Sequence, residues 1–315
     1  MRVIRCFNQR MKANAPLSRR AFLQRSAAAT GVLAAASLPG GAAEPAARML
    51  IGSQLYGWSQ YYARDGKNAY EQVDEVLSAL RDAGYDYAEG SLDIGNPANN
   101  AAFAEKLRGK GLRPVSLYTG GRLHDDRAEE TVERMLQAAK VCQAAGFTVI
   151  NCDPDSAGRE KTDDELKRQV TMLKLLGGGL KQLGMRLGIH HHTPAMRSGA
   201  REFHYNFRQS AAGTVDFCYD VHWVYRGGVA PMDALNEYGQ RVVSWHLRQS
   251  RDQIWWEDLD TGDIDYVAVA AFAKKHQLAP LYTVELALEE GTKVTRSVVE
   301  NHARSLKFVK QVFAA

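Results

Sequence analysis

The sequence predicts a (β/α)8 barrel, in which eight parallel strands close into a ring and helices cover its outside. A short apolar segment followed by a helix-patterned stretch recurs along the chain after the first forty-odd residues. Strands that alternate with helices in this way form a parallel sheet. Eight such segments are present, which is the number that closes a barrel, and polar residues gather at the ends of the later ones, where barrel enzymes place their sites.

The predicted strands are short apolar runs, and the later ones alternate in character. In the seventh, Trp245 and Leu247 alternate with Ser244 and His246. Because successive side chains of a strand point to opposite faces, we expect the large apolar set to face the helices and the smaller or polar set to face the barrel axis. In chain order, the predicted strands span residues 49–57, 85–91, 113–119, 147–153, 187–193, 215–221, 242–248 and 281–288.

The stretches between the strands show the apolar periodicity of amphipathic helices. A doubly wound open sheet is the alternative arrangement, but no glycine-rich phosphate loop follows the first strand. No long linker divides the chain, and 45% of it is hydrophobic, so we predict one barrel domain over residues 44–315. The predicted helices include residues 69–83, 129–145, 163–183 and 264–276, and a last helix at 294–313 closes the chain.

The first 43 residues are predicted to be a twin-arginine signal peptide. The pair Arg19-Arg20 is followed by a weakly apolar stretch at 27–38 and by Gly-Ala-Ala at 41–43. A basic, an apolar and a small-residue region in this order is typical of a signal peptide, and the apolar run is too short to remain as a membrane anchor. We therefore expect a periplasmic protein, cut near Ala43 and free of the membrane after cleavage.

The charge balance argues against nucleic acid as a partner. The whole chain has a formal net charge of +4, but residues 1–43 carry seven basic residues and no acidic one, so the remainder carries −3. A mildly acidic protein has no general attraction to nucleic acid or anionic lipid.

Cysteine is sparse outside the leader, where Cys142, Cys152 and Cys218 remain. An odd number without paired spacing is not a disulfide framework. We predict that all three are buried thiols.

Polar residues converge at the C-terminal ends of the last four predicted strands. Several imidazoles and two carboxylates that meet at one mouth are costly to bury without a partner, and a divalent metal ion is the natural partner. A lone strand histidine is more often a hydrogen-bonded core residue, but matching positions on four consecutive strands favour a metal site. The residues are His190 and His192 on the fifth strand, Asp220 and His222 on the sixth, His246 on the seventh and Glu285 on the eighth.

These motifs resemble those of the xylose isomerase-like barrels, also called the sugar phosphate isomerase/epimerase superfamily. The resemblance covers about residues 49–314 and is most specific in the second half. Leu-Gly-Ile-His-His-His at 187–192 resembles a fifth strand that ends in Tyr-His-Asn-His. Further matches are Asp-Val-His-Trp-Val at 220–224, Trp-His-Leu-Arg at 245–248 for His-Leu-Lys-Asp, Thr-Gly-Asp-Ile-Asp at 261–265 for Gly-x-Gly-x-Ile-Asp, and Val-Glu at 284–285.

The resemblance implies one divalent ion held by His190, Asp220, His246 and Glu285. Most epimerases of the superfamily have a glutamate where His190 stands, and it forms an acid/base pair with the eighth-strand glutamate. Only Glu285 remains of that pair here. An elimination therefore fits this chain about as well as an isomerisation.

The expected chemistry is that of an α-hydroxycarbonyl sugar. The ion would polarise the carbonyl and stabilise the enediolate that forms when the α-hydrogen leaves, with Glu285 or His192 as the base. We predict an isomerase or epimerase, in which the enediolate is reprotonated. The alternative is a lyase or dehydratase of a keto sugar or glycoside, in which a β-group is lost. Two imidazoles and two carboxylates favour Mn²⁺, Co²⁺, Zn²⁺ or Fe²⁺ over Mg²⁺. Export favours a free, oxidised or glycosidic sugar over a phosphorylated one.

Other residues are candidates for contacts with the substrate. Glu89, at the end of the second strand, resembles a family glutamate near the substrate, although an ion-paired acid explains it equally well. His124 and His204 are interpreted as ordinary loop histidines, and Glu202-Phe203 as a weaker match to a family Glu-Phe pair. The remaining candidate contacts are His222, Arg248 and Trp58.

Two other function classes remain open at this stage. A non-catalytic sugar-binding barrel would keep the aromatic-rich mouth without an ion, and metal analysis would distinguish it. Metal-dependent endonucleases occur in the same superfamily, but they use a multi-metal cluster, and the acidic mature chain and its predicted export argue against that activity. The aromatic residues of the predicted mouth are Tyr56, Trp58, Trp223, Trp255 and Trp256.

Overall fold

The computed structural model describes residues 48–314. The predicted signal peptide at 1–43 lies outside the described residues. The described residues belong to one compact unit. Within the described part, no helix is both long and apolar enough to cross a membrane.

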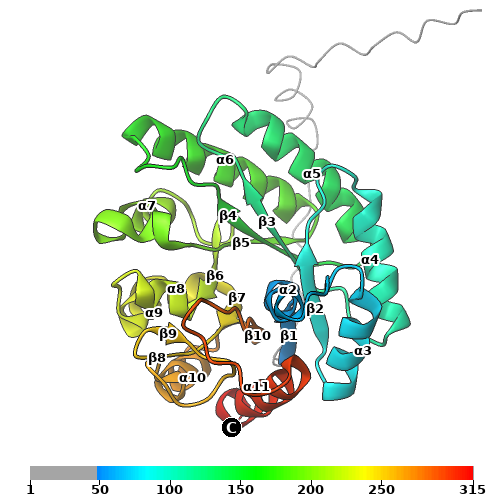
Figure 1. Cartoon of the computed structure of the whole chain (residues 1–315). Helices are drawn as coiled ribbons and strands as arrows, with labels where there is room; N and C mark the ends of the chain where they lie inside the picture. The colour runs from blue at the N-terminus through cyan, green and yellow to red at the C-terminus, as the bar shows by residue number, and fades with distance from the viewer. Residues whose placement is uncertain (1–47, 315) are drawn as a thin grey trace, which may run out of the picture. The chain divides into compact units, whose positions relative to one another are not determined.

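Eight parallel strands close into a barrel, as the sequence predicts (Figure 1). Around the barrel each strand pairs with its neighbours in the order β1, β10, β7, β6, β5, β4, β3, β2, and β2 returns to β1. The pairing from β6 to β7 shifts register between Phe217 and Cys218. The strands are β1 (Leu50–Gln54), β2 (Tyr87–Ser91), β3 (Ser116–Gly121), β4 (Val149–Pro154), β5 (Arg186–Ile189), β6 (Asp216–Asp220), β7 (Val242–Leu247) and β10 (Leu281–Val284).

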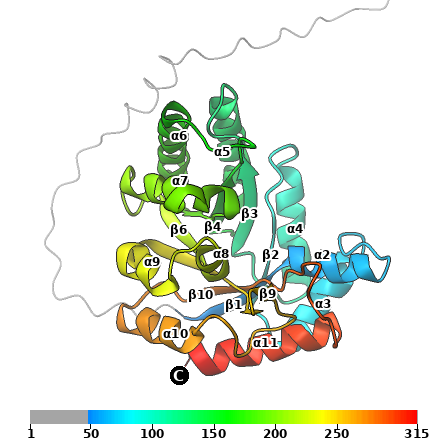
Figure 2. The same cartoon turned by 60° about the vertical axis from the view of Figure 1, so that its left-hand side comes forward.

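Helices surround the barrel, and their apolar faces pack against the strands (Figures 1 and 2). The five predicted helices are present, with ends shifted by a few residues. The longest, α6, begins with a capping box in which Thr162 and Glu165 satisfy each other's backbone N–H groups. The helices are α2 (Leu55–Arg64), α3 (Val73–Ala83), α4 (Ala98–Gly109), α5 (Ala128–Ala144), α6 (Asp163–Gln182), α7 (Arg197–Arg208), α8 (Val221–Arg226), α9 (Pro231–Tyr238), α10 (Tyr266–Lys275) and α11 (Val298–Phe313).

The first strand is shorter than predicted because a helix begins inside the predicted segment. The Gln54 side chain accepts a hydrogen bond from the backbone N–H of Tyr56 and so caps the start of α2. A small antiparallel hairpin after β7, formed by β8 (Ser250–Arg251) and β9 (Ile254–Trp255), was not predicted. Helix α2 and this hairpin both lie at the C-terminal end of the barrel, directly after strands β1 and β7.

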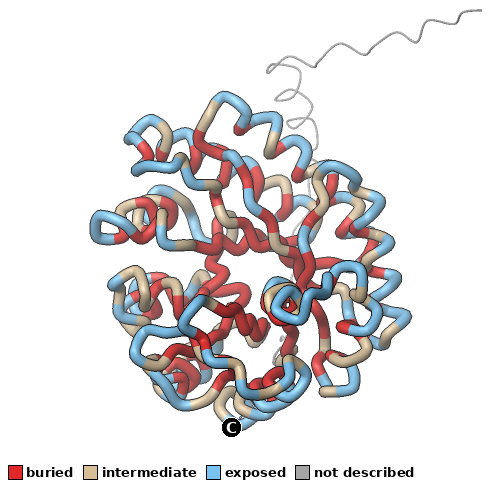
Figure 3. Tube along the Cα trace, in the orientation of Figure 1, coloured by how far each residue is buried: buried red, intermediate tan, exposed pale blue. Residues whose placement is uncertain are grey.

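The side chains of the barrel strands alternate as predicted. Inside the barrel, the Ser244 hydroxyl donates to the amide oxygen of Asn151 at 2.7 Å. On the outside, the Trp245 ring packs against Tyr282 and Phe313. Figure 3 shows the strands as a buried core within more exposed helices. Alternation of side chains therefore delivers polar groups to the axis and apolar groups to the helices.

A glycine in β1 makes room for a large side chain in the barrel interior. A Cβ atom added at Gly52 would lie 2.2 Å from the ring of Tyr87. The Tyr87 hydroxyl reaches across to the Thr283 hydroxyl at 2.7 Å. Gly52 is thus required by close packing rather than by its backbone conformation.

The three cysteines of the barrel are free and buried, as predicted. Burial raises the pKa of the Cys142 thiol to about 12. These thiols therefore behave as small apolar core residues.

Candidate metal centre and active site

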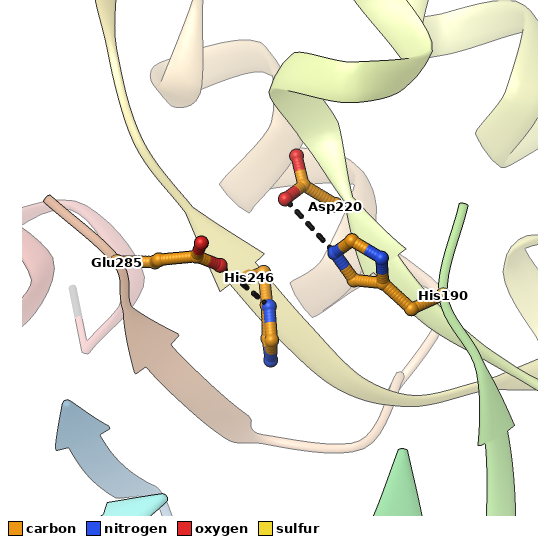
Figure 4. A group of neighbouring side chains, drawn as sticks. All are labelled: His190, Asp220, His246 and Glu285. Carbon is orange, nitrogen blue, oxygen red and sulfur yellow. Dashed lines mark hydrogen bonds and ion pairs between the residues drawn. The ribbon is translucent and has the colours of Figure 1, made fainter. Parts of the chain in front are cut away.

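Four side chains from the last four barrel strands meet at the C-terminal end of the barrel (Figure 4). His190 directly follows β5, Asp220 ends β6, His246 lies in β7 and Glu285 directly follows β10. One nitrogen or oxygen atom from each lies within 4.8 Å of the others, and all four residues are buried. The structure thus brings together the four residues that the family resemblance assigns as ligands.

The two carboxylates of this cluster are oriented by their own elements. One oxygen of Asp220 accepts the backbone N–H of Trp223 at 2.8 Å and caps α8. Its other oxygen lies 3.2 Å from Nε2 of His190. Just after β10, Glu285 places one oxygen 2.8 Å from Nδ1 of His246.

Arg248 links these carboxylates from the end of β7. Its Nη2 atom lies 3.1 Å from Asp220 and 2.7 Å from Glu285, and the side chain is buried. Although burial opposes ionisation, this guanidinium lowers the pKa of Asp220 and lowers that of Glu285 to about 2. Both carboxylates are therefore ionised at neutral pH, as metal ligands must be.

The charges at the centre leave room for a divalent cation. The carboxylates of Glu89, Asp220 and Glu285 are all buried, and Arg248 supplies one positive charge against the three. Two of the three carboxylates therefore lack a compensating charge from Arg248, and uncompensated buried charge is costly. Burial opposes a charge on His246, but the neighbouring Cys218 and Glu89 raise its pKa well above the ordinary value. The buried carboxylates therefore stabilise a positive charge at this site, from a proton on His246 or from a metal ion.

The imidazole atoms at the centre also suit a metal ion. Nε2 of His190 faces Asp220 at 3.2 Å, and Nδ1 of His246 faces Glu285 at 2.8 Å (Figure 4). Both ring nitrogens of His246 lie near carboxylates but lack the angles of hydrogen bonds. Two imidazoles and two carboxylates are a donor set that first-row transition ions accept. These four residues therefore suit the divalent metal ion that the sequence implies.

Glu89 lies beneath the four-residue cluster and does not line the cavity above it. Its side chain is fully buried, and it accepts hydrogen bonds from Ser116 and from Asn151, each at 2.7 Å. Its second oxygen lies 2.8 Å from Nε2 of His246. The expectation that Glu89 lies near the substrate is therefore replaced by a supporting contact to His246. Such carboxylate–histidine pairs orient the ligand and raise its basicity.

Replacement of Glu89 by glutamine is expected to weaken metal binding by about 10- to 100-fold, the usual cost of losing an outer partner of a histidine ligand. Gln keeps the size of the side chain but removes the charge that faces His246. Titration of the metal-free protein with Mn²⁺ measures the change. An unchanged dissociation constant would show that Glu89 is only part of the packing.

A cavity of about 360 Å³ opens above the four-residue cluster. Its wall contains the predicted site residues His190, His192, Arg248 and Glu285. The remaining lining residues are Gln54, Leu55, Tyr56, Tyr70, Gly90, Ser91, Tyr118, Trp223 and Trp255. The cavity thus joins the buried cluster to the surface, as a site for a small polar molecule requires.

Trp58 and His222 lie behind the cavity wall and not in its lining. Trp58 is fully buried, packs against His302 with the ring centroids 4.4 Å apart, and donates its indole N–H to Ser53. His222 is fully buried beside Trp255, and burial lowers its pKa to about 3. The helical course of residues 55–64 and 221–226, which the sequence analysis missed, turns both side chains into the core. The expected substrate contacts of these two residues therefore need to be corrected to packing contacts.

His192 is held by an acid that the sequence analysis did not select. Its Nδ1 atom lies 2.5 Å from Oδ2 of Asp153 in β4, and its side chain is 38% exposed to the cavity side. Burial opposes a charge on His192, but the hydrogen bond to Asp153 raises its pKa. Because Asp153 ends the fourth predicted strand, its position at the barrel mouth could have been predicted from the sequence.

The other polar residues near the fifth strand form a buried network away from the cavity lining. Glu202 accepts from Lys161 at 2.6 Å and from Gln169 at 3.0 Å. Asn206 joins this network to His191, which packs among phenylalanine rings. Glu202 is thus half of a buried ion pair that supports the loop after β5.

The sequence matches, over residues 77–311, the family described as xylose isomerase-like TIM barrel. It is 27% identical over 199 residues to an inosose dehydratase of Geobacillus kaustophilus (strain HTA426), in an alignment that covers 58% of this chain and 63% of that protein. The chain thus spans less than two-thirds of the length of this curated relative.

Solved structures share the fold at low sequence identity. The apo 3-keto-D-glucoside 4-epimerase YcjR from E. coli has a TM-score of 0.62 and 13% identity, covering 84% of this chain and 100% of that one. The IOLI protein with a bound zinc atom has a TM-score of 0.63 and 16% identity, covering 84% and 98%. These likenesses show the barrel fold.

Proposed function

Because the chain belongs to the xylose isomerase-like TIM-barrel family, we propose that it is a metal-dependent lyase that eliminates a β-substituent from a keto sugar through an enediolate. One observation carries the proposal. The cavity wall holds an ionised carboxylate, Glu285, and an imidazole, His192, that is hydrogen-bonded to Asp153, above four residues that could hold a metal ion. An elimination needs one base and one acid, and this pair supplies them.

The ion would be bound by His190, Asp220, His246 and Glu285. When bound, it supplies a Lewis acid that polarises the substrate carbonyl and stabilises the enediolate. Mn²⁺, Co²⁺, Zn²⁺ or Fe²⁺ suits this donor set better than Mg²⁺. The IOLI structure holds a zinc atom, which supports a first-row ion for this fold.

Glu285 is the base in this mechanism. A histidine that binds a metal has used its lone pair, so His190 cannot replace the glutamate that related epimerases have at its position. The second oxygen of Glu285 contacts Arg248 at 2.7 Å, but a carboxylate oxygen has two lone pairs, so this oxygen can still accept the α-hydrogen as a proton. The low pKa of Glu285 keeps it ionised for that step, and Arg248 at 2.7 Å holds its orientation.

His192 is the acid that completes the elimination. The bond between the β-carbon and its oxygen breaks, the electron pair goes to the departing oxygen, and the proton on Nε2 of His192 neutralises it. Asp153 accepts from Nδ1 at 2.5 Å and so favours the protonated imidazole. The products are the unsaturated keto sugar and water or an alcohol.

Epimerisation is the second candidate, and the same cavity geometry favours it. If the enediolate is protonated at carbon before the leaving group departs, the product is an epimer. Reprotonation requires only that a proton carrier lies beside the substrate, and His192 is one. A non-catalytic sugar-binding barrel would need neither the ion nor this pair.

The test uses keto sugars of the kinds named for the similar proteins, an inosose and a 3-keto-glucoside, with Mn²⁺-loaded protein in deuterium oxide. Nuclear magnetic resonance follows both the α-hydrogen and the products. Loss of water or alcohol together with deuterium incorporation supports the lyase, and an epimer that carries deuterium supports the second candidate. A protein that binds the sugar without exchange would be a binding barrel.

We also propose that the protein is exported to the periplasm, which favours a free, oxidised or glycosidic sugar over a phosphorylated one. The supporting observation is the Arg19-Arg20 pair with its apolar and small-residue sequel. Replacing both arginines by lysine is expected to trap the precursor in the cytoplasm. Cell fractionation with an antibody to the barrel measures this, and equal export of both forms would contradict it.

A further inference from the structure

Two exposed tyrosines line the cavity that leads to the metal centre. Tyr56 in the first turn of α2 is 47% exposed, and Tyr70 in the loop between α2 and α3 is 56% exposed. Of the six exposed large hydrophobic side chains among residues 48–314, these two line the cavity. Scattered exposed apolar residues need no explanation, but two aromatic rings at one mouth indicate a binding surface.

The helix that carries Tyr56 is tied to the loop that follows Glu285. The Gln60 side chain donates to the carbonyl of Leu288 at 3.0 Å and accepts from its N–H at 2.7 Å. The same amide lies 3.3 Å from the Tyr56 hydroxyl. Helix α2 is thereby fixed to the loop that follows Glu285, and Figures 1 and 2 show α2 at this end of the barrel.

The cavity extends from a charged interior to an aromatic rim. His190, Arg248 and Glu285 are buried at its inner end, whereas the two tyrosines are half exposed. Its volume of about 360 Å³ lies within the range of about 300–1,000 Å³ that accommodates drug-sized ligands. A ligand that engages the metal centre therefore has a continuous path to the tyrosines.

We propose that Tyr56 and Tyr70 form an outer subsite for the second ring of a glycoside whose keto-sugar ring lies at the metal centre. A pyranose presents C–H groups on its faces, which pack on an aromatic ring, and its hydroxyls meet the polar end of tyrosine. The inference rests on the proposed function for its inner ring only. It narrows the substrate class from keto sugars in general to two-ring glycosides.

The experiment compares 3-keto-glucose with cellobiose oxidised at C3 of its non-reducing ring. Activity is followed as α-hydrogen exchange in the Mn²⁺-loaded protein. Tyr70→Ala and Tyr56→Ala are each expected to raise the ratio of the two-ring KM to the one-ring KM by about 2- to 10-fold, the usual worth of one aromatic contact. Tyr70→Phe keeps the ring and is expected to keep the ratio. Tyr205→Ala, on α7 outside the cavity lining, is the matched control.

If the tyrosine-to-alanine substitutions changed the KM of both sugars equally, or changed neither, the proposed subsite would be overturned. Binding of unoxidised cellobiose and glucose, measured by saturation-transfer resonance, separates this from a failure of the proposed chemistry. If neither keto sugar reacts, a preference for cellobiose that Tyr70→Ala abolishes still supports the subsite. Equal binding of both sugars to the wild-type protein would refute it.

Discussion

Replacement of Glu285 by glutamine is expected to abolish most exchange of the substrate's α-hydrogen with solvent, by about 10²- to 10⁴-fold in rate, the usual contribution of a general base. Glutamine keeps the shape of the side chain and an oxygen for the ion or for Arg248, but its amide cannot take a proton. The rate is measured as deuterium incorporation at saturating Mn²⁺, with metal content determined on the same sample.

Glu290→Gln is the matched control, because Glu290 is an exposed glutamate five residues further along the same loop. It is expected to behave as the wild type. If Glu285→Gln held its ion and exchanged the α-hydrogen at the wild-type rate, the base would have to be another group. The structure then leaves His192, since Glu89 is buried beneath His246.

Replacement of His246 by alanine is expected to remove the metal ion from the purified protein. His246 lies between the carboxylates of Glu89 and Glu285, each 2.8 Å from one of its ring nitrogens. Its loss deletes a ligand and leaves two buried negative charges facing each other. Metal analysis should fall from about one ion per chain to a trace, because loss of even an outer partner typically costs about 10- to 100-fold in affinity.

His276→Ala is the control for this change, since His276 lies at the end of α10 and stacks on Phe272. Circular dichroism checks that the barrel is intact. Should His246→Ala fail to fold, Asp220→Asn serves instead, because asparagine retains the oxygen that caps α8. Full metal occupancy in a folded His246→Ala protein would mean that the ligands are elsewhere.

The barrel and the residues at its mouth were predictable because both follow from periodicity. Alternation along residues 242–247 set Ser244 and His246 on the axis face and Trp245 on the helix face. Once four strands are placed in order, their C-terminal residues must share one mouth. His190, Asp220 and Glu285 lie at such ends, so their meeting did not depend on loop structure.

The residues that the sequence analysis misplaced are those whose positions depend on short helices and on cross-barrel contacts. Trp58 follows β1 so closely that it was taken for a mouth residue, but α2 begins at Leu55 and turns the ring into the core. The partnership of Glu89 with His246 spans opposite parts of the barrel, and no local pattern encodes it. Asp153 was overlooked because its role depends on His192, thirty-nine residues away.

The most direct test of the central claim, metal-dependent enediolate chemistry at the barrel mouth, is deuterium exchange before and after metal removal. Protein loaded with Mn²⁺ is predicted to exchange the α-hydrogen of a keto sugar, to lose this activity on treatment with a chelator, and to regain it when one ion per chain is restored. The chelator-treated protein should remain folded by circular dichroism, because the barrel core does not depend on the ion. Equal exchange rates in the loaded and the metal-free protein would contradict the account.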